Sequence, residues 1–151
     1  MRKQKETNVL FLCTHNSARS QIAEGLLRHL GGNTYYVSSA GTEKTFVRPQ
    51  AIEVMAEIGI DISQQESKRL EQYLQEDFDQ VITVCDEANE ACPVFPNAKQ
   101  RRHWSFPDPS KADGTQLEQL KVYRAVRDAL QERIEKELLS SKSTDEQEPQ
   151  P

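Results

Sequence analysis

The chain lacks a long hydrophobic run. Its basic N-terminus, MRKQKETN, leads into an apolar segment that extends only from Val9 to Cys13. This is too short for the apolar region of a signal peptide or for a membrane-spanning helix. We therefore expect a cytoplasmic protein that contacts no membrane. With 151 residues, of which 28% are charged and 36% hydrophobic, the chain suits one soluble domain with a buried core.

The sequence also lacks an excess of positive charge. The formal net charge is −5, and no long basic run is present. Proteins that bind nucleic acids neutralise phosphates with clustered Lys and Arg residues, so nucleic acid is not an expected partner.

Cysteine is scarce. Three cysteines, an odd number, in a chain without an export signal do not suit a framework of structural disulfides. The thiols are then either inert residues of the core or reactive groups, and their surroundings in the sequence have to decide between the two.

Hydrophobic periodicity divides the chain into alternating strands and helices. Continuous apolar runs that end at polar loops predict short buried strands, and apolar residues at spacings of three and four predict amphipathic helices. Pro49 fits a first helical turn. The predicted strands are 9–12, 35–40, 80–85 and 100–104, and the predicted helical segments are 18–30, 49–59, 69–76 and 115–139, with a loop or short helix over 86–96.

This alternation predicts an α/β fold, a single-domain three-layer sandwich with a four-stranded parallel sheet covered by helices on both faces. We place the domain at 8–139, after an N-terminal extension over 1–7. The polar tail over 140–151 lacks apolar residues and is expected to be disordered. No internal repeat and no second domain is recognisable.

The segment CTHNSARS, from Cys13 to Ser20, joins a predicted buried strand to the start of a helix. Five residues between Cys13 and Arg19 allow backbone N–H groups to surround one tetrahedral oxyanion, and the planar guanidinium of Arg19 can hold two of its oxygens. The same positive field favours a thiolate at Cys13, to which Ser20 can donate a hydrogen bond. The residues expected to form the oxyanion site are Thr14, His15, Asn16, Ser17, Ala18, Arg19 and Ser20.

An ordinary strand-to-helix turn, with Ser17 as the helix cap, is the competing interpretation of this segment. The position between a buried strand and a helix start favours the oxyanion site. Asn16 tolerates a left-handed backbone, which such a tight loop requires. The side chain of His15 is expected to point outward.

Three groups should meet at one edge of the sheet, because ligands of parallel sheets lie beyond the carboxyl ends of the strands. Cys13 ends the first predicted strand, Cys85 ends the third, and Asp108 follows the fourth. Asp108 lies between Pro107 and Pro109, which stiffen the loop and fix the direction of its carboxylate.

The two later thiols, Cys85 and Cys92, are separated by six residues in VCDEANEACP. This spacing is neither that of a typical zinc site nor that of a Cys-x-x-Cys redox motif. In a helix the two sulfurs would lie about 10 Å apart along the axis. Because the Cα atoms of a disulfide lie within about 7 Å of each other, a bond between them would require the segment to rearrange.

The string VLFLCTHNSARSQIAEGLL resembles the N-terminal signature of the low-molecular-weight protein tyrosine phosphatase fold, and is most similar to the thioredoxin-linked arsenate reductases of that family. The resemblance extends from Asn8 to Ile134, nearly the whole predicted domain. It continues through the strings YYVSSAGTE, AIEVMAEIGIDIS, VITVCDEANEACP and HWSFPDPS.

The resemblance implies a mechanism. Cys13 attacks arsenate, Cys85 attacks Cys13 with release of arsenite, and Cys92 attacks Cys85, so that a Cys85–Cys92 disulfide remains for reduction by thioredoxin. Glutaredoxin with glutathione is an alternative reductant. Asp108 acts as the general acid toward the leaving oxygen, and Arg19 binds the oxyanion, arsenate or phosphate. We expect no cofactor and a monomer.

One position departs from the pattern. Some relatives hold a potassium ion with residues that match Asn16, Glu24, Ser39 and an Asp, but Lys68 stands at this last position. We expect the Lys68 ammonium to replace the ion and to pair with Glu24, and so expect no metal site.

A low-molecular-weight phosphatase is the first alternative function. It would need Cys13, Arg19 and Asp108 but neither of the later thiols, and weak phosphatase activity is expected in either case. The tyrosine pair that follows Asp-Pro in the phosphatases is missing, and Ser110-Lys111 stands there instead. This departure disfavours phosphotyrosine as the substrate.

Two further alternatives remain. One is a non-enzymatic oxyanion or redox sensor with Cys85 and Cys92 as its switch. The other is a structural zinc site built from three cysteines and a histidine. His103 and Trp104 are interpreted as packing and strand-end residues.

Overall fold

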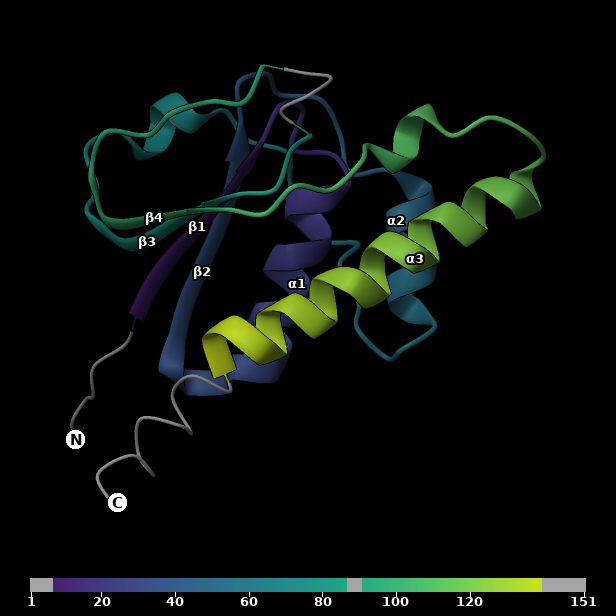
Figure 1. Ribbon diagram of the computed structural model, residues 1–151, viewed down its shortest axis with the longest axis horizontal. Helices are drawn as coiled ribbons and strands as arrows, with labels where there is room; N and C mark the ends of the chain where they lie inside the picture. The colour runs from purple at the N-terminus through teal and green to yellow at the C-terminus, as the bar shows by residue number, and fades with distance from the viewer. Residues whose placement is uncertain (1–6, 87–90, 140–151) are drawn as a thin grey trace.

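The computed structural model describes residues 7–86 and 91–139, which form layers around a parallel sheet (Figure 1). The four strands lie in the order β2-β1-β3-β4, with all neighbours parallel. This confirms the α/β single-domain fold. The strands are β1 (Thr7–Cys13), β2 (Tyr35–Gly41), β3 (Phe78–Thr83) and β4 (Ala98–His103), the α-helices are α1 (Arg19–Gly31), α2 (Pro49–Ala56) and α3 (Gln116–Ile134), and the short helices are η1 (Gly32–Thr34), η2 (Leu70–Tyr73), η3 (Pro109–Lys111) and the π-helical η4 (Glu135–Leu139).

The three α-helices of the described chain pack on one face of the sheet (Figure 1). Successive side chains of a strand point to opposite faces, so Val9 and Phe11 of β1 join the core under α1, α2 and α3, whereas Leu10 and Leu12 join a second core. That second core includes Phe78 and is covered by η2 and by the loop before β4.

The second face therefore carries a single turn of 3-10 helix where the sequence predicted a helix over 69–76. The reason lies in the two ends of this segment. Arg69 is extended and forms a bridge with Gly41, and β3 already begins at Phe78. The few residues between these fixed points leave room for one short turn, η2.

The ends of other strands and helices differ by a few residues from the predicted ends. β3 ends at Thr83, so Cys85 lies two residues beyond the strand, although the N–H of Val84 still donates to the Leu12 carbonyl (2.8 Å). α2 ends at Ala56 and is followed by Gly59, whose φ is +80°. The predicted strand 9–12 begins earlier, at residue 7.

Three predictions fall wholly or partly outside the described residues. These are the N-terminal extension, the polar tail and the centre of the 86–96 segment. Where that segment is described, at Asp86 and at 91–96, it is not helical.

The strand register brings the candidate groups to one edge of the sheet. Leu12 pairs with Thr83, and Thr83 pairs with His103. Cys13, one residue past Leu12, and Cys85, two residues past Thr83, therefore leave the sheet at the same carboxyl edge, as the sequence predicted.

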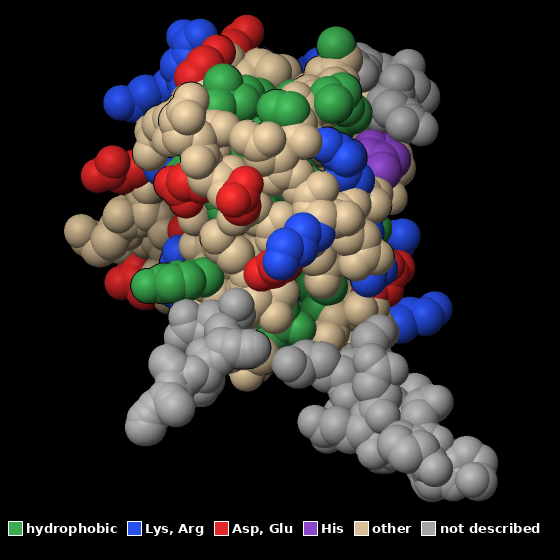
Figure 2. Space-filling model, turned by 90° about the vertical axis from the view of Figure 1, so that its left-hand side faces the viewer, with side chains coloured by type: hydrophobic (Ala, Val, Ile, Leu, Met, Phe, Trp, Pro, Cys, Tyr) green, Lys and Arg blue, Asp and Glu red, His purple; other side chains and the backbone are tan. Residues whose placement is uncertain are grey.

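No helix among the described residues has the length and apolarity needed to cross a membrane. On the face shown in Figure 2, acidic and basic side chains are interspersed, with no broad area of one sign.

Candidate active site

The loop between β1 and α1 is held in place by hydrogen bonds to its backbone carbonyl oxygens. Five consecutive carbonyls, from Thr14 to Ala18, accept hydrogen bonds of 2.8 to 3.3 Å. Glu43 N and Thr42 Oγ1 donate to the Thr14 carbonyl, and Thr45 Oγ1 and Ser67 Oγ donate to the His15 carbonyl. Gln21 Nε2 donates to the carbonyl of Asn16, Arg48 N to that of Ser17, and Ile22 N to that of Ala18. Because N–H and C=O point in opposite directions across a trans peptide, the N–H groups of residues 15–19 point to the other side, a nest-like arrangement that suits an anion.

Two backbone positions make this tight loop possible. Asn16 has a φ of +50°, which confirms the left-handed conformation expected there. A Cβ atom at Gly41 would lie 2.7 Å from the carbonyl oxygen of Thr14 and 2.9 Å from the backbone nitrogen of Asn16. Only glycine allows β2 to approach the loop this closely. The predicted strand ended at residue 40, directly before Gly41.

The N-terminus of α1 adds positive potential at the nest. Ala18 is its N-cap residue, no side chain caps the helix, and its first turn contains no acidic residue. The first N–H groups of a helix lack intrahelical acceptors and form the positive end of the helix dipole. Ser17 therefore does not cap α1, contrary to the competing interpretation of this segment.

Cys13 is a buried free thiol, and its sulfur lies 2.8 Å from the Ser20 hydroxyl oxygen. The side-chain amide of Asn16 donates to Ser20 Oγ (2.8 Å) and to Ser39 Oγ (2.9 Å), and the Ser39 hydroxyl donates to Glu24 Oε1 (2.5 Å). Asn16 thus donates to Ser20, and the Ser20 hydroxyl can itself donate to the sulfur when Cys13 is a thiolate. The predicted contact between Ser20 and Cys13 is thus present, at the end of a chain of polar contacts that begins at Glu24.

Glu24 is buried, and two cations balance its charge. Arg28 approaches to 2.5 Å, and Lys68 Nζ lies 3.9 Å from Glu24 Oε1, which confirms the predicted pairing with Lys68. Burial lowers the pKa of Lys68, while the charge of Glu24 opposes this shift. Lys68 also donates from Nζ to the Glu66 carbonyl (2.7 Å) and from its backbone N–H to Asn16 Oδ1 (2.7 Å). The absence of a potassium site remains a prediction.

Arg19 and Asp108 face each other next to the nest. The guanidinium of Arg19, at the first residue of α1, is buried and donates to the Phe106 carbonyl (3.1 Å). Its other terminal nitrogen lies 3.6 Å from Asp108 Oδ2. The second carboxylate oxygen of Asp108 accepts from the backbone N–H (2.9 Å) and the hydroxyl (2.7 Å) of Ser110, which orients the carboxylate. The sequence prediction that Asp108 reaches this edge is confirmed.

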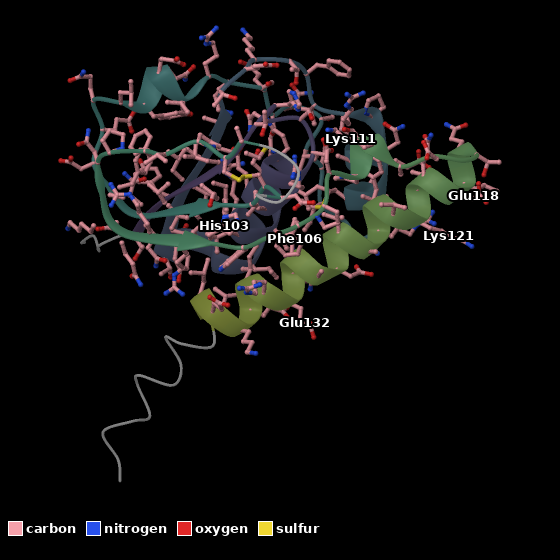
Figure 3. All side chains as sticks on the ribbon, turned by 45° about the horizontal axis from the view of Figure 1, so that its top comes forward. His103, Phe106, Lys111, Glu118, Lys121 and Glu132 are labelled. Atoms are coloured by element: carbon pink, nitrogen blue, oxygen red, sulfur yellow. A yellow bond between two sulfur atoms is a disulfide. The ribbon has the colours of Figure 1, made fainter. Side chains whose placement is uncertain are left out.

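Cys85 and Cys92 are joined by a disulfide, with their Cα atoms 6.0 Å apart. The pair lies beyond the end of β3, close to His103 at the end of β4 (Figure 3). Cys85 is fully buried, whereas Cys92 lines an open pocket of about 410 Å³ together with Val94, whose side chain is 79% exposed. The wide separation of the two sulfurs that a fully helical segment would impose is therefore not present in this oxidised form.

The two histidines near the site play different parts. His15 is partly exposed and lies 3.6 Å from Glu43, so its side chain points outward as predicted. His103 is the last residue of β4, which confirms the strand-end interpretation, but the predicted packing role is wrong, because the side chain is not buried, contacts Thr83 Oγ1 (2.6 Å) and lies near both sulfurs of the disulfide. Trp104, in contrast, is buried against Phe11 as predicted.

Comparisons with known proteins show which family the chain belongs to. An arsenate reductase of Halalkalibacterium halodurans is 48% identical over 126 residues, which cover 83% of this chain and 91% of the relative. Two solved structures, an arsenate reductase in the phosphate binding state and one in the oxidized state, superpose with TM-scores of 0.74 and 0.72. Each is 37% identical in sequence to this chain, and the match covers 86% of this chain and 95% of the chain in the solved structure. The family model for low molecular weight phosphotyrosine protein phosphatase matches residues 8–148, and the chain therefore belongs to that family.

Proposed function

We propose that the protein is an arsenate reductase that converts arsenate to arsenite. One observation carries this conclusion. A loop suited to an oxyanion, with a free thiol, Cys13, lies at the same sheet edge as a pair of cysteines, Cys85 and Cys92, that forms a disulfide. A phosphatase would need the nest alone. Several relatives and solved structures that are similar to the chain at high coverage are named arsenate reductases.

The first step is the formation of a bond between sulfur and arsenic. The N–H groups of residues 15–19 and the guanidinium of Arg19 bind the arsenate oxygens, and the Cys13 thiolate, with Ser20 as its hydrogen-bond donor, attacks arsenic. One oxygen leaves as water and takes a proton from Asp108, whose carboxyl group lies beside Arg19. A Cys13 thiol-arsenate adduct results.

The second step reduces arsenic. The Cys85 thiolate attacks the sulfur of Cys13, the bond between sulfur and arsenic breaks, and its electron pair remains on arsenic, which leaves as arsenite. Cys13 and Cys85 are then joined by a disulfide. Cys92 attacks Cys85, which frees the Cys13 thiolate and produces the Cys85–Cys92 disulfide. Arsenic gains the two electrons that the thiols lose.

The cycle closes when a dithiol reduces the Cys85–Cys92 bond, and we assign this role to thioredoxin, with glutaredoxin and glutathione as the alternative. The accessible sulfur would be that of Cys92, because this residue lines the open pocket beside the exposed Val94, while Cys85 is buried. Such recycling requires a reducing compartment, which favours the cytoplasm. The cycle needs no cofactor, and every group in it belongs to one monomer.

The test compares two activities in two variants. Arsenite production with thioredoxin, its reductase and NADPH should cease after about one turnover in Cys92→Ser, because the Cys13–Cys85 disulfide is no longer resolved. The same variant should keep its weak hydrolysis of p-nitrophenyl phosphate, which uses Cys13 alone. Cys13→Ser should lose both activities. Unchanged arsenite turnover in Cys92→Ser would contradict the proposal.

A further inference from the structure

Tyr123 of α3 is a buried tyrosine whose hydroxyl has no hydrogen-bond partner within the described part of the chain. Its side chain is 1% exposed and belongs to the core cluster that includes Cys13 and Phe106. The hydroxyl of the buried Tyr35, in contrast, donates to the Leu138 carbonyl (3.1 Å). Because buried tyrosines usually have a partner for this group, the exception at Tyr123 calls for an explanation.

Tyr123 lies near the residues that begin two other helices. α3 packs against α2, whose N-cap is Arg48, and against η3, whose N-cap is Asp108. The stretch from Phe106 to Lys111 runs beside α3 in Figure 3. Burial raises the pKa of Tyr123, the Arg48 guanidinium opposes this shift, and the Asp108 carboxylate adds to it. Both charges therefore lie close to the phenol.

Arg48 and Asp108 also have polar atoms without partners. Asp108 accepts from Ser110 through Oδ1, while its Oδ2 lies 3.6 Å from a terminal nitrogen of Arg19, outside hydrogen-bond distance. Arg48 Nε is buried and has no hydrogen-bond partner in the described chain. The backbone N–H of Arg48 donates to the Ser17 carbonyl (2.9 Å), which fixes this residue next to the loop between β1 and α1. Donors without acceptors therefore gather on the side of the site where Asp108 lies.

We propose that the Tyr123 hydroxyl is a substrate-binding group of the oxyanion site, and that it donates a hydrogen bond to the arsenate oxygen that leaves as water beside Asp108. This inference rests on the proposed function and adds a specificity-determining residue to it. Arg48 supplies positive charge on the same side of the site.

The position beside Asp108 decides which oxygen Tyr123 contacts. Cys13 attacks arsenic from one side, and the leaving oxygen lies on the opposite side, in line with the sulfur. Asp108 gives its proton to that oxygen, so a donor next to Asp108 faces the same oxygen. This oxygen has a further lone pair, which can accept from Tyr123. Since burial raises the pKa of Tyr123, the phenol is protonated at neutral pH and acts as a donor.

The test is Tyr123→Phe, which removes the hydroxyl and keeps the ring. The probe is inorganic phosphate, which presents four oxygens as arsenate does, and its binding to fully reduced protein is measured by calorimetry near neutral pH. Phosphate should bind about 10- to 100-fold more weakly, because a hydrogen bond to a charged group is lost. kcat/KM for arsenate should fall by a similar factor. The melting temperature without phosphate should not fall, since the hydroxyl has no protein partner to lose.

Tyr35→Phe is the matched control. Tyr35 begins β2, at the end of the strand opposite to Gly41 and the oxyanion site. This variant loses the hydrogen bond to the Leu138 carbonyl, so it should melt at a lower temperature and bind phosphate like the wild type. The two variants thus separate a role in binding from a role in stability.

The proposal is overturned if Tyr123→Phe binds phosphate as tightly as the wild type, or if its weaker binding comes with a fall in melting temperature as large as that of Tyr35→Phe. Phosphate binding does not depend on arsenate reduction. A wild-type protein that binds phosphate but forms no arsenite would therefore refute the proposed function and leave this inference standing.

Discussion

The Ser20 hydroxyl lies 2.8 Å from the sulfur of Cys13, where it can donate to a thiolate, and its oxygen accepts from the side-chain amide of Asn16. This arrangement explains how a thiol buried at the end of a strand is kept as a nucleophile. An alanine at position 20 would remove the donor while leaving the nest of N–H groups in place.

We predict that Ser20→Ala slows the attack of Cys13 by about 10- to 100-fold, since a hydrogen bond to a charged group contributes about 1.5–3 kcal/mol. The measurement is the rate of alkylation of Cys13 by iodoacetamide near neutral pH, in a background in which Cys85 and Cys92 are serines. The exposed Ser105 provides the matched control, Ser105→Ala. Equal rates in the two variants would show that Ser20 does not act on the thiolate.

Lys68 leads to a second prediction at this scale. Its ammonium lies beside the buried carboxylate of Glu24, so the wild-type protein should have the same melting temperature in potassium and in sodium chloride of equal ionic strength. Lys68→Met removes one of two balancing cations and should melt lower, with a partial recovery that is specific to potassium. Lys44→Met, at an exposed lysine, should melt like the wild type in both salts. A potassium-specific stabilisation of the wild type would contradict this account.

At the scale of elements, a charged contact joins the C-terminal end of α2 to the middle of α3. Glu57, directly after α2, accepts from Arg124 at 2.8 to 3.1 Å and from Arg127 at 2.8 Å. The two arginines are three residues apart and therefore lie on one side of α3. Arg127 also donates to the Val54 carbonyl (2.8 Å), so the same contact reaches into α2.

This contact predicts a loss of stability in acid. Hydrogen bonds from Arg124 and Arg127 lower the pKa of Glu57 from 4.5 to about 2. Because the pKa is lowered by folding, the stabilisation is fully present above about pH 4.5 and is lost as the pH falls toward 2. Glu57→Gln should therefore lose less in melting temperature than the wild type between pH 5.5 and 3. The exposed Glu53 on α2 gives the control, Glu53→Gln, and an identical pH dependence in both variants would refute the assignment.

At the scale of the whole molecule, the sheet was predictable because its strands are continuous apolar runs bounded by polar loops. The start of α3 was predictable as well, since Thr115 and Glu118 form a capping box. The cover of the second face was not predicted correctly, because the extended conformation of Arg69 depends on its bridge to Gly41.

The tight loop between β1 and α1 was predictable from the segment Cys13 to Ser20, but the groups that hold the loop in shape were not. Thr42, Thr45 and Ser67 are small hydroxyl residues in irregular segments, and no periodicity connects them with a loop 28 to 52 residues away. The position of His103 beside the disulfide was missed for a related reason, since a strand pattern does not reveal which loop crosses its end.

The most direct test of the whole account is to map the disulfides after a single arsenate turnover. Fully reduced protein is mixed with one equivalent of arsenate, quenched with acid, alkylated and analysed by peptide mass spectrometry. The account predicts one arsenite per chain with a Cys85–Cys92 disulfide in the wild type, and a Cys13–Cys85 disulfide in Cys92→Ser. Arsenite formed while Cys85 and Cys92 both remain free thiols would contradict it.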